Sequence, residues 1–499
     1  IGFKEKNIKI NLTDLAFDLG QIYLETKSIE LDAIKIKSDK NISSQISDIT
    51  ISGKDLNENL KGNIATTLAN QPNIGINSFG IITSKPSLRG FSGDRFLLTR
   101  DGNETGDLSQ SSIDHVISLD MTEVDHIEII RGPRALLYGP NAIGGVVNTS
   151  LLGNPSIRYK KFTQQLLIGK DSANDAEYGN MVLYMPFLKK NQLNFFYSNR
   201  LTGNQSSPIG ELLNTSSGTN IYKLGLTHYY KKNYINLIAE SFNMYYGIPP
   251  YPLAHEQGVD IVLSKDTYQL NSHTKVSFLG MTEMDIKYSN ISYIHVEMIN
   301  DSSNSTSMDY WLKNGDFHVG LAKETEILKF IIRNDSDVYG IEYTKRDFVP
   351  YEFYLSPPTN EQQISFFGFR ERTINSLGID LLSSFRLAYL EIKPGEYKYN
   401  SSIANLIEKD ENGDPVLDEN GDRISLVKNR HFNSLSLSMG IRKVINNFEY
   451  NFWLMHTTRP PRLEELFSDG PHLASYAFEI GNPNLNSEKI YGKIGRAHV

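Results

Sequence analysis

The chain has 499 residues, a formal net charge of −8 and no cysteine. It contains no run of 18 apolar residues, which excludes a protein that crosses a membrane with helices. The acidic balance, without a long basic stripe, argues against nucleic acid as a partner. A membrane barrel is still possible, because barrel strands are apolar only at alternate positions and average out as hydrophilic.

Near the N-terminus, Ile8, Ile10 and Leu12 alternate with polar residues, and a turn at Gly20 leads into a second short apolar run. This pattern predicts two short strands. A mostly apolar hexamer follows, next to the polar run 37–47, and could be a last strand of the same sheet. An extended segment beside a flexible linker can also add as a strand to the sheet edge of a partner protein. The hexamer consists of Leu31, Asp32, Ala33, Ile34, Lys35 and Ile36.

Residues 56–68 carry apolar side chains at every fourth position, which predicts a helix. Asp55 is a suitable N-cap for it, and Pro72 follows its expected end. Two histidines, His115 and His126, come before and within the next strand-like segments. We interpret both as structural or surface residues and not as metal ligands.

Two glycine-rich stretches lie about 35 residues apart. The first runs from Ser87 to Gly102 and contains SLRGF, DRFLL and DG. The second, 124–148, reads VDHIEIIRGPRALLYGPNAIGGVVN and predicts a strand at 127–130 and another at 143–148. Its four glycines between positions 132 and 145 indicate positive-φ turns or close backbone approach, and not a helix.

Together the two stretches closely resemble the signature of the plug domain of TonB-dependent outer-membrane receptors. The resemblance implies a mostly β fold, in which an N-terminal α+β plug, residues 37–150, lies in the lumen of a transmembrane antiparallel β-barrel. That barrel is of the 22-stranded type, truncated here. The matching plug residues are Arg89, Gly90, Arg95, Asp101, Gly102, Arg131, Gly132, Pro133, Tyr138, Gly139, Gly144, Gly145 and Asn148.

The same resemblance gives the N-terminal segments a role. Residues 1–36 are similar to the remnant of a carboxypeptidase-regulatory-like β-sandwich followed by a TonB box, 31–36, which the energy-coupling protein grasps. An ordinary N-terminal hairpin is the other interpretation. We expect the natural protein to begin further upstream, because the first strands of such a sandwich and a secretion signal are missing.

Arginines of the plug are the charged residues that the resemblance singles out. Arg131 is expected to face the barrel wall and to pair with carboxylates there, which would seat the plug. Arg89, Arg95 and Arg134 are further candidates for the same role. The alternative is that these side chains only solvate a polar plug surface.

From about residue 155 onward, short alternating runs predict about 13 antiparallel strands, which we assign to a partial barrel at 151–492. In the clearest run, 434–442, leucine, methionine and isoleucine alternate with serine and glycine. Similar runs lie at 181–187, 222–228 and 448–454. A soluble β-sandwich would show the same alternation with its faces reversed, so the alternation alone does not separate the two folds. The resemblance to a plug domain favours the barrel, because a plug implies an enclosing barrel.

Polar inserts separate these strands and are expected to form long loops, at 204–219, 247–258, 300–307, 349–363 and 407–429. Tyr251, His255 and Glu256 make one of them a candidate ligand-binding loop, the alternative being a stiff solvated loop. The repeated DENGD at 410–414 and 418–422 offers oxygens for Ca²⁺ but lacks the bidentate Glu of an EF-hand. A turn-rich hairpin tip is therefore the preferred interpretation.

A third match lies near the C-terminus, in RPPRLEELF at 459–467, GPH at 470–472 and FEIGNPNL at 478–485. It is similar to a late barrel segment, in a form found in a subgroup that includes zinc-uptake receptors. His472 and Glu479 could be metal ligands on that basis, but shared architecture explains the match better, so no metal ligand is assigned. No cofactor is expected.

The last seven residues, 493–499, resemble read-through into a sequencing adapter, and we expect them to lie outside the fold. Barrels of plugged transporters have about 22 strands. Since only about 13 are found here, we expect the natural chain to continue further.

For function, the resemblance implies energised uptake at the outer membrane of a Gram-negative bacterium, in contact with its lipid. The TonB complex would move the plug after a scarce ligand has bound, such as a metal ion, a siderophore or another metal chelate, heme, cobalamin or a glycan. A signal-transducing receptor and a passive porin or adhesin are the alternatives. No nucleophile elbow, phosphate loop or HExxH motif occurs, so neither catalytic residues nor an enzyme are expected.

Overall fold

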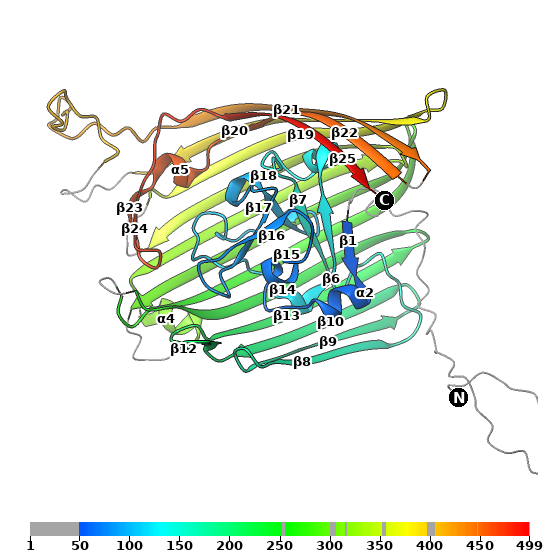
Figure 1. Cartoon of the computed structure of the whole chain (residues 1–499), viewed down its shortest axis with the longest axis horizontal. Coiled ribbons are helices and arrows are strands. Elements are labelled where there is room, and N and C mark those ends of the chain that lie inside the picture. The colour runs from blue at the N-terminus through cyan, green and yellow to red at the C-terminus, as the bar shows by residue number, and fades with distance from the viewer. Residues whose placement is uncertain are drawn as a thin grey trace, which may run out of the picture.

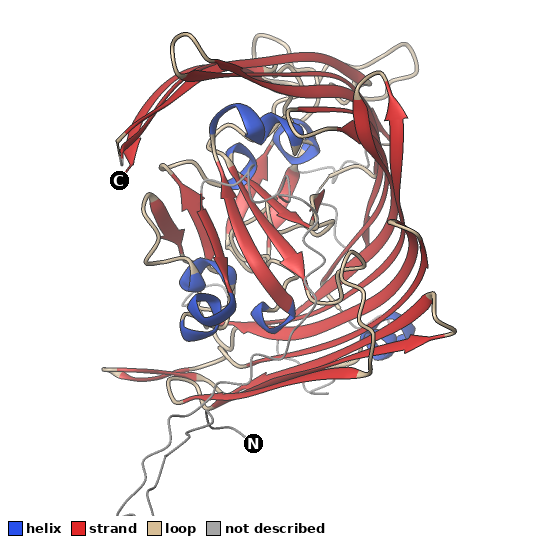
Figure 2. Cartoon of the chain, turned by 90° about the vertical axis from the view of Figure 1, so that its right-hand side faces the viewer, coloured by secondary structure: helices blue, strands red, loops and turns tan. Residues whose placement is uncertain are grey.

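The computed structural model describes residues 49–251, 255–299, 306–314, 317–351, 356–396, 405–446 and 448–498. An N-terminal domain, residues 49–151, lies inside a curved wall of long strands (Figure 1, Figure 2). The predictions for residues 1–36, including the TonB-box candidate, fall outside the described part. Among the described residues, no helix has the length and apolar character needed to cross a membrane.

In the part of the chain that the structure describes, fourteen antiparallel strands form the wall, and each pairs with its neighbours in the sheet. Figure 2 shows the wall curving round the N-terminal domain, with β8 and β25 as its two edges. Residues 493–498, which were expected to lie outside the fold, continue β25 and pair with β22. The strands are β8 (Thr163–Asp171), β9 (Ala176–Phe187), β10 (Asn191–Thr202), β13 (Ser217–Tyr230), β14 (Asn233–Ile248), β15 (Val259–Phe278), β16 (Met281–Ile299), β17 (Val319–Arg333), β18 (Asp337–Tyr351), β19 (Thr359–Ile374), β20 (Ile379–Pro394), β21 (Arg430–Ile445), β22 (Phe448–Arg459) and β25 (Glu488–His498).

The two faces of this wall differ as the alternation predicts. On β21, Leu435 and its apolar neighbours at positions 437, 439 and 441 are 42–57% exposed on the outer face. Ser434, Ser436 and Ser438 are at most 6% exposed and face the N-terminal domain. Apolar side chains outside and small polar ones inside are what lipid and a polar lumen require. The expected barrel wall around a plug is therefore confirmed.

Connections at the two ends of the wall also differ in length. At one end, β9–β10, β13–β14 and β15–β16 are joined by turns of two or three residues. At the other end lie the long connections, which carry β11 (Gln205–Ser207), β12 (Gly210–Leu212), α4 (Met308–Asn314), α5 (Leu463–Phe467), β23 (Asp469–His472) and β24 (Ala477–Ile480). Asp410 and Asp418 each accept hydrogen bonds from backbone amides two and four residues later, so the turn prediction for the DENGD repeat is confirmed.

The plug holds a five-stranded sheet in the order β1-β6-β7-β4-β5 and a separate hairpin, β2–β3. Its core is a cluster of apolar side chains from this sheet and the two helices, including Leu56, Ile127 and Val147. The elements are β1 (Ile49–Ser52), α2 (Gly53–Glu58), α3 (Ile64–Thr67), β2 (Ile74–Asn77), β3 (Lys85–Leu88), η1 (Gly93–Arg95), β4 (Leu97–Arg100), β5 (Asn103–Glu104), η2 (Met121–Glu123), β6 (Val124–Ile130), η3 (Gly132–Leu137) and β7 (Val146–Leu151).

Two local predictions for the plug are wrong. The single helix expected at 56–68 is divided into α2 and α3, because the Asn63 side chain accepts the Thr66 amide and starts a new helix. Asp55 lies inside α2 and is not its N-cap. The glycine-rich stretch, expected to be non-helical, forms the short 3-10 helix η3 directly after β6. Gly132 and Gly145 do have the positive φ angles predicted there, +69° and +129°.

Candidate metal centre

A loop of the plug, residues 105–120, joins β5 to η2 and is organised around the buried Asp107. One carboxylate oxygen accepts the Ser109 amide at 3.0 Å and the hydroxyl of Thr105 at 2.9 Å. The other accepts the amide and hydroxyl of Ser118 at 2.9 and 2.7 Å. Burial alone would raise the pKa of Asp107, but the Lys265 ammonium and these hydrogen bonds hold it below its usual range.

Strands of the barrel fix the same loop through its backbone carbonyls. Lys265 on β15 donates to the Ser118 carbonyl at 2.8 Å, and Lys323 on β17 donates to the Asp107 carbonyl at 3.0 Å. The hydroxyl of Tyr246, on β14, donates to the Asp114 carbonyl at 3.2 Å. The position of the loop relative to the wall is therefore set by side chains from three strands, β14, β15 and β17.

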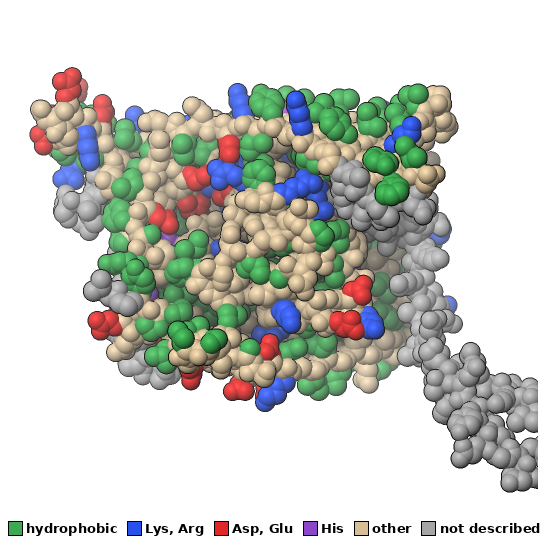
Figure 3. Space-filling model, viewed as in Figure 1, with side chains coloured by type: hydrophobic (Ala, Val, Ile, Leu, Met, Phe, Trp, Pro, Cys, Tyr) green, Lys and Arg blue, Asp and Glu red, His purple; other side chains and the backbone are tan. Residues whose placement is uncertain are grey.

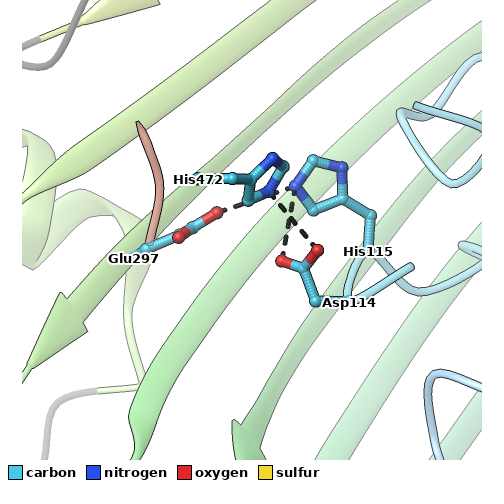
Figure 4. Close-up of side chains that lie close together, drawn as sticks. All are labelled: Asp114, His115, Glu297 and His472. Carbon is cyan, nitrogen blue, oxygen red and sulfur yellow. Dashed lines mark ion pairs between the residues drawn. The ribbon is translucent and has the colours of Figure 1, made fainter. Parts of the chain in front are cut away.

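Four buried side chains, two of them from this loop, converge from three parts of the chain (Figure 4). Asp114 and His115 come from the plug, Glu297 from the inner face of β16, and His472 from β23 in the long β22–β25 connection. Their ligand atoms all lie within 4.8 Å of one another. None of the four residues is more than 5% exposed.

Several separations between these atoms approach those of ligands around one small metal ion, and none exceeds 4.8 Å. His472 Nε2 lies 3.3 Å from Asp114 Oδ1, and His115 Nε2 lies 3.6 Å from Glu297 Oε1 and 3.8 Å from Asp114 Oδ2. Zinc bonds to nitrogen and oxygen of about 2.0–2.2 Å in a tetrahedron place neighbouring ligands about 3.3–3.6 Å apart. The cluster therefore needs little rearrangement to hold such an ion.

Several polar atoms of the cluster have no hydrogen-bond partner among the described residues. They are Asp114 Oδ2, His115 Nε2, both carboxylate oxygens of Glu297 and both ring nitrogens of His472. Buried polar atoms are nearly always paired, and leaving them unpaired costs free energy. An ion bound by one ligand atom from each residue would satisfy the atoms that face the centre, whereas His472 Nδ1 faces Glu479.

Outer partners orient the imidazoles toward the centre of the cluster. The Leu108 carbonyl accepts from His115 Nδ1 at 3.1 Å, which leaves the lone pair on Nε2. Glu479 Oε1 lies 3.3 Å from His472 Nδ1, so a carboxylate backs the second imidazole. Such carboxyl and carbonyl partners are typical of metal-binding histidines.

Charges in the cluster are balanced for a divalent cation. Burial would raise the pKa of Asp114, but His115 and His472 hold it well below its usual range. Burial would lower the pKa of His472, yet Asp114 and Glu479 raise it well above its usual value. Two carboxylates and neutral imidazoles would make an uncharged complex with a divalent ion, which can be buried at low cost.

A cavity of about 50 Å³ lies behind His115. Leu108 and Ser111, which both contact His115 Nδ1, are among its lining residues. This volume holds a few water molecules, whereas pockets for drug-sized organic ligands measure about 300–1,000 Å³.

The sequence identified only part of this centre. The sequence offers His472 and Glu479 as possible ligands but favours shared architecture, and it favours a structural role for His115; the structure brings all three together. Asp114 and Glu297 were not predicted at all. A usable indication was the His-x-Glu spacing at 295–297, since alternate residues of a strand share a face. His126 lies apart, at the start of β6, where it bonds to the exposed Asp125.

The predicted ligand loop at 247–258 lies near the same end of the barrel. Tyr251 is 51% exposed and its ring lies 5.2 Å from that of Tyr476, in the hairpin that carries His472. His255 is 3% exposed, and neither ring nitrogen has a hydrogen-bond partner among the described residues. Glu256 is exposed. No contact in the described structure joins His255 or Glu256 to the metal cluster.

Plug motif residues hold the plug sheet and its turns. Asn148 accepts from the Thr99 hydroxyl and the Gly102 amide and donates to Glu128, so it ties three segments together. Asp101 accepts the Leu151 amide at 3.1 Å. Glycines are required where neighbours approach: a Cβ on Gly132 would lie 2.8 Å from the Trp453 ring of the barrel.

The arginines expected to seat the plug divide into two groups. Arg131 is buried and donates to the Pro72 carbonyl, within the plug, at 3.1 Å. Arg95 and Arg134 pair with the barrel carboxylates Glu488 and Glu371, at 2.9 and 2.6 Å.

Other charged residues, which the sequence did not indicate, also join plug to wall. On the face shown in Figure 3, acidic and basic side chains lie close together below the upper strands of the wall, whereas three of the five pairs given below involve the lower strands β10, β13 and β14. Most of these pairs are partly or fully buried, and therefore costly to break. They are Asp120–Arg200, Arg100–Glu240, Glu123–Lys223, Glu104–Arg346 and Asp94–Arg462.

Comparison with known proteins agrees with this architecture. The profile of the TonB-dependent Receptor Plug Domain matches residues 40–146. The vitamin B12 transporter BtuB of Vibrio cholerae is 43% identical over 61 residues, which are 12% of this chain and 10% of that protein. A hemin receptor of Yersinia enterocolitica is 36% identical over 87 residues, 16% of this chain and 12% of that protein.

Solved structures extend the likeness to the barrel. The copper transporter OprC superposes with a TM-score of 0.65 at 13% identity, over 87% of this chain and 67% of that one. The Serratia marcescens hemophore receptor HasR, solved with its hemophore HasA and heme, superposes with a TM-score of 0.68 at 12% identity, over 89% and 68% of the chains. The chain belongs to the TonB-dependent receptors.

As a TonB-dependent receptor, the protein is located in the outer membrane of a Gram-negative bacterium. Its sequence matches span only about a tenth of the curated relatives. These matches therefore establish the family and not the ligand.

Proposed function

We propose that this TonB-dependent receptor imports a bare divalent transition-metal ion, and that Zn²⁺ fits its site best. The observation that carries the proposal is the buried cluster of Asp114, His115, Glu297 and His472, shared between plug and barrel. No chelator is required, because the protein itself supplies a full set of four ligand atoms.

The size of the site argues against a metal chelate as the ligand. The relatives BtuB and the hemin receptor are named for vitamin B12 and heme, both far larger than an ion. Here the ligand atoms lie within 4.8 Å of one another, and the adjacent cavity measures about 50 Å³. An organic ligand would have to separate plug, wall and hairpin to reach these four side chains.

The donor set favours zinc over other common ions. Two imidazole nitrogens and two carboxylate oxygens at tetrahedral spacing suit Zn²⁺, whereas Ca²⁺ and Mg²⁺ require six or more oxygens. Cu²⁺ would bind the same atoms strongly in a test tube, since affinity follows the Irving–Williams order. Selectivity should therefore be judged from uptake as well as from affinity.

The arrangement of the ligands suggests how an energised step releases the ion. Asp114 and His115 belong to the plug, Glu297 to the wall and His472 to the β23–β24 hairpin. Force from the TonB complex, acting through the candidate TonB box at 31–36, would move the plug and divide this set. No part retains more than two of the four ligands, so affinity falls and the ion can leave.

The test compares zinc binding and zinc uptake in the receptor and in single-ligand variants. Removal of a residue that only orients a metal ligand weakens metal affinity by roughly 10–100-fold. H115A, E297Q and H472A each remove a ligand itself, so each should weaken zinc affinity by more than this. Affinity is measured by competition with a chromophoric chelator on the purified receptor. Uptake of radioactive zinc by cells should fall in parallel.

H228Q is the matched control, because His228 lies on the outer face of β13 and bonds to Asn191, far from the cluster. It should bind and import zinc like the parent receptor. A parent receptor that binds no zinc, or single-ligand variants that bind it as tightly as the parent, would contradict the proposal.

A further inference from the structure

A third histidine lies beside the metal centre, on the wall side. His295 is two residues before Glu297 on β16, so both side chains are on the inner face of the strand. It is fully buried, and its Nε2 has no hydrogen-bond partner among the described residues although it lies 3.3 Å from Glu297 Oε1. Its ring centre is 4.6 Å from that of His115, edge to face.

His295 differs from the two cluster histidines in what holds its Nδ1. The Leu108 carbonyl at His115 and the Glu479 carboxylate at His472 can only accept, so both favour a proton on Nδ1. This leaves Nε2 of each ring to face the ion, and at His472, whose pKa is raised, the ion displaces the Nε2 proton when it binds. The Leu108 carbonyl favours the Nδ1 proton of His115 although the Ser111 hydroxyl also lies 3.0 Å from that nitrogen.

At His295, Nδ1 instead lies 2.9 Å from the hydroxyl of Tyr293. A hydroxyl can donate or accept, so this partner supports either form of the ring. With a proton on Nε2, the ring faces Glu297 as a donor. With the proton on Nδ1, Nε2 is a metal ligand and Tyr293 becomes the acceptor. The ring can therefore alternate between the two without losing its partner.

We propose that Glu297 and His295 form a second ion position on the barrel wall, to which the ion passes as the plug withdraws Asp114 and His115. Glu297 is the pivot, because its Oε1 lies within 3.6 Å of His115 Nε2 and 3.3 Å of His295 Nε2. The ion therefore exchanges a plug ligand for His295 while it stays bound to Glu297. The proton on Nε2 leaves and another is taken up at Nδ1 by exchange with water, so the ring gains no net charge.

The wall is suited to this step because it stays in place when the plug moves. β16 is paired along most of its length with β15 and β17, which keeps residues 295 and 297 at fixed positions. A pair of ligands holds an ion weakly compared with four. The second position would thus keep the ion from following the plug and then release it.

This inference rests on the proposed function, and its test separates resting affinity from transport. In H295Q, zinc affinity should change by no more than about threefold. The visible spectrum of bound Co²⁺, which reports the ligand set, should stay the same. The initial rate of energised zinc uptake should fall at least about tenfold, the loss expected when an outer partner of a metal site is removed.

Y293F is the second variant, because it keeps the imidazole but removes the hydroxyl that serves both ring forms. It should lower uptake in the same direction at unchanged affinity, and it carries the test if H295Q does not reach the membrane. H228Q again serves as the matched histidine control.

Two results would overturn the inference. Unchanged uptake in both variants would make His295 a packing residue. An affinity loss above about tenfold with an altered Co²⁺ spectrum would make it a ligand of the resting site. In either case a parent receptor that binds and imports zinc leaves the proposed function standing, whereas a parent that binds no zinc ends both.

Discussion

Glu479 does not belong to the four-ligand cluster, yet it lies 3.3 Å from the Nδ1 of one of its histidines, His472. Replacing it with glutamine removes the charge that stabilises an Nδ1 proton and allows the ring to turn. We expect E479Q to weaken zinc affinity by about 10–100-fold, as for other outer partners of metal ligands. A competition titration on the purified receptor measures the change.

E177Q is a suitable control for this substitution, because Glu177 pairs with Lys170 on the exposed surface. The two variants should differ clearly in affinity. If E479Q and E177Q bound zinc equally well, Glu479 would not be orienting His472.

For single residues, the sequence could indicate which side chains are able to bind a metal, but not that they lie together in one cluster. His472 and Glu479 were noticed because they lie in a recognisable segment, and His115 because it is a histidine in the plug. Their convergence depends on the seating of the plug and on the register that places Glu297 opposite Ile261. Both are long-range properties, so a local pattern of residues cannot report them.

Next to the loop of the metal centre, η2 and its capping residue Asp120 hold the plug against the wall. This carboxylate pairs with Arg200 on β10 at 2.7 Å, and both side chains are at most 4% exposed. D120N would leave a buried guanidinium without its charged partner. We expect a loss of about 3 kcal/mol in the stability of the seated plug, measured by hydrogen exchange of plug amides.

The same pair predicts an effect of pH. Burial would raise the pKa of Asp120, but Arg200 holds it below its usual range. A carboxylate with a lowered pKa stabilises the folded state above about pH 4 and loses this effect as the pH falls further. Plug exchange should therefore accelerate below pH 4 in the parent, and less steeply in D120N. D125N, at an exposed carboxylate nearby, should behave like the parent.

Elements were predicted well where one periodicity dominates. Alternation identified the strand runs and their outer faces, as at 434–442. The helix expected at 56–68 failed because Asn63 acts as a cap in the middle of an otherwise helical pattern. Tyr251 and His255 were assigned to a loop correctly, but the contact of Tyr251 with Tyr476 depends on a hairpin more than 200 residues away.

The whole molecule is a plug and a wall joined by buried ion pairs, with the candidate metal centre on their interface. The resemblance of two motifs in the plug was enough to predict this architecture, because a plug requires an enclosing barrel. It could not predict which charged residues join the two parts. Arg95 and Arg134 contact the wall as expected, whereas the Asp120–Arg200 and Glu104–Arg346 pairs carried no indication in the sequence.

If transport requires the plug to move, fixing η2 to the wall should block uptake without affecting resting affinity. Thr122 Oγ1 and Ser198 Oγ, from plug and barrel, lie 2.6 Å apart, so cysteines at these positions place their sulfurs within bonding reach. The chain itself contains no cysteine, so the two introduced cysteines can pair only with each other within one molecule. In oxidised T122C/S198C, zinc affinity should equal that of the parent, uptake should fall at least about tenfold, and a thiol reductant should restore it. Each single variant controls for the substitution itself.

Parental uptake by the oxidised double variant would mean that η2 stays in place during transport, and that the ligand set divides by movement of the β23–β24 hairpin instead.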